Sequence, residues 1–213
     1  MVLMVFSLVQ INTVVPIKYE DMRKLLDEEA LDQFRKRGMN PETPNLRGLI
    51  DGPEHYFQQV EAANSILDGV LPVVEGYLDE VHKLTGRKYG LFGYHGHPEP
   101  RHVIVACGSS VSTVEDAVNH RNAQGERVGL IKVRLWRQFS IKQLVDALPK
   151  SVEKVAVIDR VRDYLASGGP LFQEVCTSLM MGGRRDVQLV NGRYGLGSKD
   201  FTPGMALAIF DNL

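Results

Sequence analysis

Several features that would assign this 213-residue sequence to a particular class of protein are scarce or missing. The net charge at pH 7 is only -1, which gives no electrostatic reason to expect nucleic acid or an anionic membrane surface as a partner. The Gly-x-Gly-x-x-Gly pattern of dinucleotide-binding folds does not occur. No internal repeat or low-complexity tract occurs either, which excludes repeat architectures.

Cysteine is limited to Cys107 and Cys176, which lie far apart in different sequence patterns. An iron–sulfur cluster takes about four thiolates, so these two side chains cannot hold one, and any cluster must lie on other polypeptide. The low count favours a reducing compartment, with a structural disulfide as the alternative. Cys107 lies in an apolar run, where a buried hydrophobic role is favoured over that of a nucleophile.

Long hydrophobic runs are also missing. The stretch from Met1 to Val15 is apolar, but it lacks a basic region and a small-residue cleavage site, and it falls short of the roughly 20 apolar residues of a membrane span. We therefore expect a buried strand there. The protein is expected to be soluble and cytoplasmic, or to lie in an anaerobic energy organelle if its source is eukaryotic.

The first third of the chain is predicted to be helical and irregular. Apolar residues recur at helical spacing until Gly38, and the Asn40-Pro41, Thr43-Pro44 and Gly52-Pro53 pairs then indicate a long loop. The expected elements are helices over 19–36, 56–67 and 73–85, the last closed by Gly86, and a Gly-, Pro- and His-rich hinge over 89–100.

From Arg101 onward, short apolar runs alternate with helical patterns. Four such strand–helix units predict a parallel sheet with helices on both faces, because right-handed crossovers place them there. Ser112 with Glu115, and Ser140 with Gln143, fit the capping box of a helix start. The expected strands cover 102–107, 127–137, 154–160 and 187–190, and the expected helices cover 112–124, 140–148, 171–181 and a last one that Thr202 caps and Pro203 opens.

The closing segment from Gly192 to Leu213 resembles the end of the second domain of pyruvate:ferredoxin (flavodoxin) oxidoreductase. Other segments resemble that family in the same order and at similar spacing. They are Arg47-Gly48, Tyr56-Phe57-Gln58, Glu61-Ala62-Ala63-Asn64, Leu84 to Tyr89, Val103 to Ala106 with Gly108-Ser109-Ser110, Gly125 to Leu135, and Ala147-Leu148-Pro149-Lys150.

The resemblance implies an α/β fold, a doubly wound, mostly parallel sheet like the C-terminal domain of transketolase, with a helical and irregular N-terminal extension. Residues 93–213 would form core domain II, and residues 1–92 the tail of the first domain and a linker. The implied function is that of a non-catalytic structural domain or subunit. The parent enzyme would convert pyruvate, coenzyme A and oxidised ferredoxin to acetyl-coenzyme A, carbon dioxide and reduced ferredoxin.

By the same resemblance, thiamine diphosphate, magnesium and iron–sulfur clusters belong to the parent enzyme, with coenzyme A as substrate. We expect no cofactor, metal or catalytic residue in this chain, which alone would be inactive. Its partners would be the other domains or subunits, in a homodimeric enzyme that reduces ferredoxin or flavodoxin. Two alternatives stay open: the related region of a sulfite reductase flavoprotein, and a free-standing module that binds an anion or nucleotide.

Three loops depart from the family pattern, all at expected domain contacts. Gly93 to Arg101 replaces an Asp-Tyr-x-Gly-Ala-Pro-Asp-Ala-Glu pattern, and Leu49 to Gly52 replaces a Thr-Ala-Gln-Asn type. The third, Asp159 to Ala166, stands where the family has Asp-Arg-Thr-Lys-Glu-Pro-Gly-Ala. A divergent homologue with altered partners or reduced activity is therefore a further alternative.

Two groups of residues are candidates for an anion site. Gly108-Ser109-Ser110 follows the first strand of the series and opens a helix, where backbone N–H groups can hold a phosphate or carboxylate. A plain tight turn is the favoured interpretation of so short a match. The second group lies near the carboxyl ends of two strands, where open parallel sheets bind ligands, although interdomain salt bridges are favoured. It consists of Arg134, Arg137, Arg160 and Arg162.

Two further clusters receive a structural interpretation. His95, His97 and His102 lie near Glu99, but an extended chain would turn His95 and His97 to opposite faces. A solvated hinge is therefore expected rather than a metal site. Trp136 and Phe139 flank Arg137 and favour a docking surface over a cofactor stack.

Overall fold

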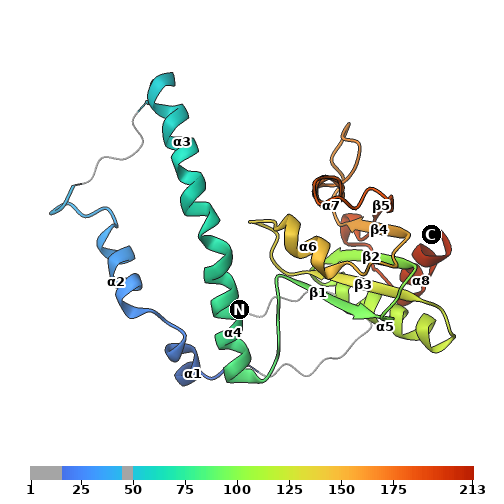
Figure 1. Ribbon diagram of the computed structural model, residues 1–213. Coiled ribbons are helices and arrows are strands. Elements are labelled where there is room, and N and C mark those ends of the chain that lie inside the picture. The colour runs from blue at the N-terminus through green and yellow to red at the C-terminus, as the bar shows by residue number, and fades with distance from the viewer. Residues whose placement is uncertain (1–15, 45–49) are drawn as a thin grey trace. The chain divides into compact units, whose positions relative to one another are not determined.

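The computed structural model describes residues 16–44 and 50–213 of the chain (Figure 1). The described residues divide into two compact units, one ending at Tyr89 and one running from Gly90 to Leu213, and each is described by itself. The strand expected within 1–15 and the Arg47-Gly48 pair lie outside the described residues. No helix in the described part of the chain is both long and apolar enough to cross a membrane.

The first unit is helical. The single helix expected over 19–36 is wrong, because the chain breaks between α1 (Tyr19–Lys24) and α2 (Glu28–Lys36). The carboxylate of Asp27 accepts the N–H of Ala30 at 2.9 Å and so caps α2, which starts a new helix inside the apolar pattern. The other helices of this unit are α3 (Pro53–Asp68) and α4 (Val70–Thr85), which ends at Gly86 with φ 70°.

These four helices contain no buried residue. Large apolar side chains such as Phe34, Phe57 and Ile66 are exposed along them. A helix normally buries its apolar stripe against another element, so the described part of this unit leaves apolar surface without a covering layer.

The second unit is built on a five-stranded sheet with the order β1-β3-β2-β4-β5. Four strands are parallel, and β1 pairs antiparallel with β3 at the edge. The expected doubly wound, mostly parallel α/β fold is thereby confirmed. The strands are β1 (Phe92–Gly96), β2 (His102–Cys107), β3 (Val128–Val133), β4 (Lys154–Asp159) and β5 (Gln188–Arg193).

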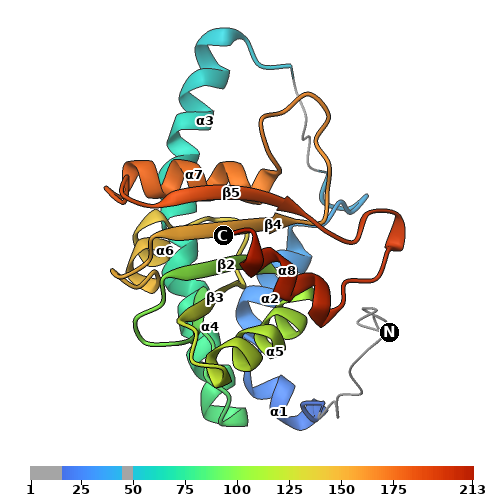
Figure 2. The same cartoon turned by 90° about the vertical axis from the view of Figure 1, so that its right-hand side faces the viewer.

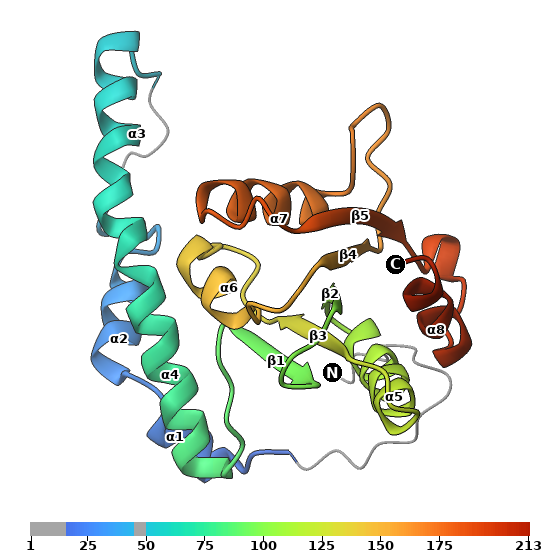
Figure 3. The same ribbon diagram turned by 45° about the vertical axis from the view of Figure 1, so that its right-hand side comes forward.

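Helices cover both faces of this sheet. In Figures 2 and 3, α5 and α8 lie on one face while α6 and α7 lie on the other. The central strands are therefore buried on both sides, which explains their continuous apolar runs. Ile104 and Leu130 pack toward the α5 and α8 side, with Phe210 of α8. The helices are α5 (Ser110–Ala123), α6 (Ile141–Ala147), α7 (Pro170–Met181) and α8 (Pro203–Asp211).

The hinge expected over 89–100 is wrong, because part of it forms the edge strand β1. Its sequence, Phe-Gly-Tyr-His-Gly, contains none of the β-branched residues that mark a strand. The strand forms through its pairing with β3 instead. The Tyr94 side chain packs closely over Gly129 of β3, where an added Cβ would lie only 2.4 Å from the Tyr94 oxygen. Burial raises the pKa of Tyr94 to about 12, and its hydroxyl donates to the carbonyl of His97.

Only one of the two expected capping boxes forms. Ser140 precedes α6 and its hydroxyl accepts the N–H of Gln143 at 3.3 Å, as expected. The box at Ser112 is wrong, because α5 already begins at Ser110. The Ser112 hydroxyl instead donates to the carbonyl of Ser109 at 3.3 Å, within the first turn.

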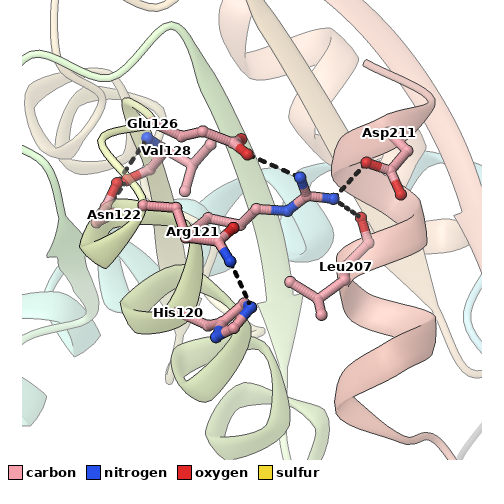
Figure 4. A network of polar contacts seen from close by, with 8 residues as sticks. His120, Arg121, Asn122, Glu126, Val128, Leu207 and Asp211 are labelled. Carbon is pink, nitrogen blue, oxygen red and sulfur yellow. Dashed lines mark hydrogen bonds and ion pairs between the residues drawn. The ribbon is translucent and has the colours of Figure 1, made fainter.

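An arginine joins the ends of α5 and α8 (Figure 4). Arg121 donates to the carboxylate of Glu126 at 2.7 Å, to the carbonyl of Leu207 at 3.2 Å and to the carboxylate of Asp211. Its side chain is 18% exposed. Next to it, Asn122 closes the turn by bonding both the N–H and the carbonyl of Val128. Because cations stabilise helix C-termini, one guanidinium serves both helix ends and the turn.

Replacing Arg121 by glutamine is expected to lower the free energy of unfolding by about 1–3 kcal/mol, because the partly buried Leu207 carbonyl and Glu126 carboxylate lose their donor. Chemical denaturation of the full chain measures this. The control is Lys142→Gln, since Lys142 is 84% exposed and, among the described residues, forms an ion pair only with Asp146 along α6. That change should cost about 0.5 kcal/mol or less. Equal losses in the two variants would contradict the bridging role of Arg121.

Candidate functional site

The candidate site lies at the edge of the sheet where the parallel strands end. The strands β2 and β4 are neighbours, but β2 leads into α5 on one face while β4 leads toward α7 on the other. Connections that leave adjacent strands in opposite directions open a crevice at their carboxyl ends. The loops after Cys107, Asp159 and Arg193 converge there.

The loop after β2 is a tight turn. Gly108 has φ 74°, a left-handed conformation that favours glycine, and α5 begins two residues later. Ser109 is the N-cap of α5, and its side chain makes no capping hydrogen bond. The buried hydroxyl of Ser110 donates to the carbonyl of Cys107 at 3.4 Å. The turn therefore directs the N-terminus of α5 into the crevice.

The loop after β4 is held by a buried carboxylate. Asp159 is 6% exposed and accepts the N–H groups of Leu171 and Phe172 at 2.9 and 3.1 Å. These are the second and third residues of α7, so the negative charge also faces the positive end of the helix dipole. A Cβ at Gly169 would lie 2.2 Å from an Asp159 oxygen, which leaves room only for glycine.

The loop after β5 supplies an aromatic wall. The rings of Tyr194 and Phe201 are 4.8 Å apart, and the Tyr194 hydroxyl donates to the carbonyl of Cys107 at 3.4 Å. Burial raises the pKa of Tyr194, so this hydroxyl keeps its proton at neutral pH. Burial, together with the charge of Asp159, also raises the pKa of the Cys107 thiol. The thiol therefore stays protonated, which does not suit a nucleophile.

Together these loops enclose a hollow of about 270 Å³. Two cations, Arg160 and Lys199, lie on it against one carboxylate, Asp200. The Nε of Arg160 donates to the carbonyl of Gly195 at 3.3 Å. The full lining consists of Ser109, Ser110, Thr113, Arg160, Tyr194, Gly195, Ser198, Lys199, Asp200 and Phe201.

The structure brings together only part of the candidate set. Ser109, Ser110 and Arg160 line the hollow, and Gly108 forms the turn behind them. The other arginines lie elsewhere. Arg134 donates to the carbonyl of Gly90 at 3.3 Å, Arg137 lies 4.5 Å from the ring of Trp136 and 3.1 Å from the Glu174 carboxylate, and Arg162 lies 5.2 Å from the ring of Tyr164.

Seven of the ten lining residues are missing from the sequence-based set, among them Thr113, Tyr194 and Lys199. Thr113 follows Ser110 by one helical turn, so helix periodicity could have identified it. Tyr194 and Lys199 follow β5, and the rule that ligands bind beyond strand carboxyl ends applies to that strand as well. Phe139, expected beside a docking surface, packs against Phe92 of β1 with ring centroids 5.1 Å apart.

The three histidines of the predicted hinge region, His95, His97 and His102, each have different surroundings. His95 lies in β1, 2.7 Å from the amide oxygen of Asn119 and 3.3 Å from the Glu115 carboxylate. The ring of His97 accepts the N–H of Glu99, and burial lowers the pKa of His102. Among residues 16–44 and 50–213, no group of three or more histidine, cysteine or acidic side chains is arranged to hold a metal ion.

Comparison with known proteins identifies relatives of the whole chain. Residues 101–205 match the family model of pyruvate:ferredoxin oxidoreductase core domain II. Pyruvate:ferredoxin oxidoreductase of Moorella thermoacetica is 45% identical over 204 residues, which are 96% of this chain and 17% of that protein. Pyruvate-flavodoxin oxidoreductase of Rhodospirillum rubrum is 40% identical over 211 residues, 96% of this chain and 18% of that protein.

A third relative has a different name. Pyruvate dehydrogenase [NADP(+)] of Cryptosporidium parvum is 40% identical over 200 residues, which are 92% of this chain and 10% of that protein. The chain therefore spans less than a fifth of the length of each of these three relatives.

Replacing Gly169 by alanine is expected to lower the free energy of unfolding by about 1–3 kcal/mol, since the added methyl group collides with Asp159. Its backbone, at φ -67° and ψ 162°, would itself accept alanine. Gly204→Ala is the matched control, because its nearest neighbour would be 3.8 Å away. Thermal melts that show equal losses for the two variants would contradict the close packing of Gly169 on Asp159.

Proposed function

The chain is homologous to one part of the pyruvate:ferredoxin oxidoreductases, with their core domain II at residues 101–205, and we propose that it serves as a non-catalytic structural domain or subunit of such an enzyme. The parent enzyme oxidises pyruvate with coenzyme A and passes electrons to ferredoxin or flavodoxin. The observation that carries this proposal is the alignment of 96% of the chain with only 17% of the Moorella relative.

The chemistry of the chain supports a structural role. Two cysteines are fewer than the about four thiolates of an iron–sulfur cluster, and the pKa of each is raised by burial. Thiamine diphosphate, magnesium and the clusters would then be held by other parts of the parent enzyme. The expected partners are those other parts, in a homodimeric assembly.

The relatives of this chain are named for different electron acceptors. This chain is about equally similar to relatives named for flavodoxin and for NADP(+), at 40% identity each. A segment shared by enzymes named for different acceptors does not itself select the acceptor. In our proposal the acceptor is chosen elsewhere in the parent enzyme, and this chain supplies a scaffold common to both kinds.

We propose the loop 161–166, between β4 and α7, as a docking element of this scaffold. It projects from the sheet in Figure 3, and Val161, Tyr164 and Leu165 on it are exposed. Leu165 has φ 70° where the family pattern has glycine. A non-glycine residue there costs about 1–2 kcal/mol, and its fully exposed side chain gains no packing within the described residues.

A partner surface that covers Leu165 would recover this cost. The occupant we propose is the remainder of the parent enzyme, which accounts for more than four fifths of the Moorella relative. The apolar tip is flanked by Arg162, whose guanidinium lies 5.2 Å from the ring of Tyr164. The matching surface is therefore an apolar patch with an acidic rim.

The scaffold role is tested by a chimera in which residues of this chain replace the homologous 204-residue segment of the Moorella enzyme. We expect the chimera to assemble and to reduce ferredoxin with pyruvate and coenzyme A, because its cofactors lie in the retained parts. The isolated chain should show no turnover. Activity of the isolated chain, or an assembled chimera that binds its cofactors without turnover, would refute the proposal.

The docking element is tested by two substitutions of Leu165. Leu165→Gly should raise the free energy of unfolding of the chain by about 0.5–1 kcal/mol, because relief of strain exceeds the added entropy of glycine. Leu165→Ala keeps the strain and should change stability little. Both should weaken co-purification with a parent enzyme that lacks the homologous segment. Unchanged co-purification for both variants would contradict docking through this loop.

A further inference from the structure

One side chain in the hollow at the carboxyl edge has an unmet hydrogen-bonding capacity. Thr113 is only 4% exposed and lines the hollow. Its hydroxyl makes no hydrogen bond with any residue in the described part of the chain. Among the described residues, the side-chain atoms that are both fully buried and unpaired do not include this hydroxyl oxygen, so it is reachable from the hollow. This hydroxyl is therefore available to a bound group.

The N-terminus of α5 adds donors to the same hollow. Within residues 90–213, which are described throughout, α6, α7 and α8 each receive a side-chain cap, from Ser140, Asp159 and Thr202. The N-cap of α5, Ser109, provides none. The first N–H groups of a helix lack intrahelical partners and carry the positive end of its dipole. In α5 the N–H of Val111 reaches the carbonyl of Gly108 at 3.3 Å, and Ser109 and Ser110, whose N–H groups open the helix without a cap from the Ser109 side chain, line the hollow.

The charge of the lining is matched to an anion. Arg160 and Lys199 approach from the loops after β4 and β5, while Asp200 is the one carboxylate among the lining residues. Arg160 uses only its Nε within this loop, toward the carbonyl of Gly195. The nearby carboxylate of Asp159 is already engaged by two N–H groups of α7. The lining thus carries an excess of one positive charge.

We propose that this hollow binds a single phosphate-sized oxyanion, either free phosphate or the terminal group of an organic phosphate. The oxyanion would accept from the hydroxyl of Thr113, from the N–H groups that open α5, and from Arg160 and Lys199. The volume of about 270 Å³ is large enough for such a group, and it lies just below the about 300–1,000 Å³ of pockets that enclose whole drug-sized ligands. This site is independent of the scaffold role and needs no other part of the parent enzyme.

The test is a titration of the full 213-residue chain with sodium phosphate, followed by amide chemical shifts. Saturable shifts centred on residues 109–113 and 199 are expected. Absence of such shifts at about 50 mM phosphate, where even a millimolar site fills, would overturn the proposal. Adenosine 5′-monophosphate and adenosine form the second arm. Binding of the monophosphate through the same residues supports an organic phosphate, whereas equal binding of adenosine overturns the proposal.

Substitutions localise the site. Arg160→Gln and Lys199→Gln should each weaken phosphate binding about tenfold, the usual effect of losing a hydrogen bond to a charged group. Thr113→Val, which keeps the shape of the side chain, should weaken it about threefold to tenfold. Arg162→Gln is the matched control, because Arg162 lies in the same loop but does not line the hollow. Equal weakening by Arg160→Gln and Arg162→Gln would show that phosphate responds only to the net charge of the region, and would overturn the proposed site.

Discussion

The buried carboxylate of Asp159 is the constraint on which the carboxyl edge of this sheet depends. It ends β4 and caps the first turn of α7, so it fixes both ends of the segment between them. Arg160 is thereby directed toward the hollow, and the loop 161–166 is free to project. Gly169 lies so close to Asp159 that a side chain at this position would collide with the carboxylate. One ion–helix contact thus organises both the proposed anion site and the proposed docking element.

Much of the second unit could be predicted from its sequence, because its central strands are buried on both faces. The run His102 to Cys107 forms a strand with the predicted bounds, and Thr202 caps the last helix as predicted. Local sequence patterns failed to predict the elements that form only through contacts with distant parts of the chain. The strand β1 is stabilised by pairing with β3 and by the packing of Tyr94 on Gly129, neither of which its own composition reveals.

The residues of the candidate site were likewise predictable only in part. The helix-start argument pointed to Ser109 and Ser110, and the rule that ligands bind beyond the carboxyl ends of parallel strands pointed to Arg160; all three line the hollow. It could not tell which arginines turn away. Arg137 stacks on Trp136 and Arg134 binds a backbone carbonyl, and both interactions depend on how the chain leaves β3. Lys199 enters the hollow from a loop whose path is set by contacts of Tyr194 and Phe201.

The central claim is that Asp159 holds the start of α7 and, through it, the loops of this edge. Amide hydrogen exchange of the full chain measures it residue by residue. The amides of Leu171 and Phe172 should be protected about as strongly as those of β4, because both are bonded to a buried acceptor. In Asp159→Ala that protection should be lost while the amides of β2 keep theirs. Rapid exchange of Leu171 and Phe172 in the unsubstituted chain would contradict the claim.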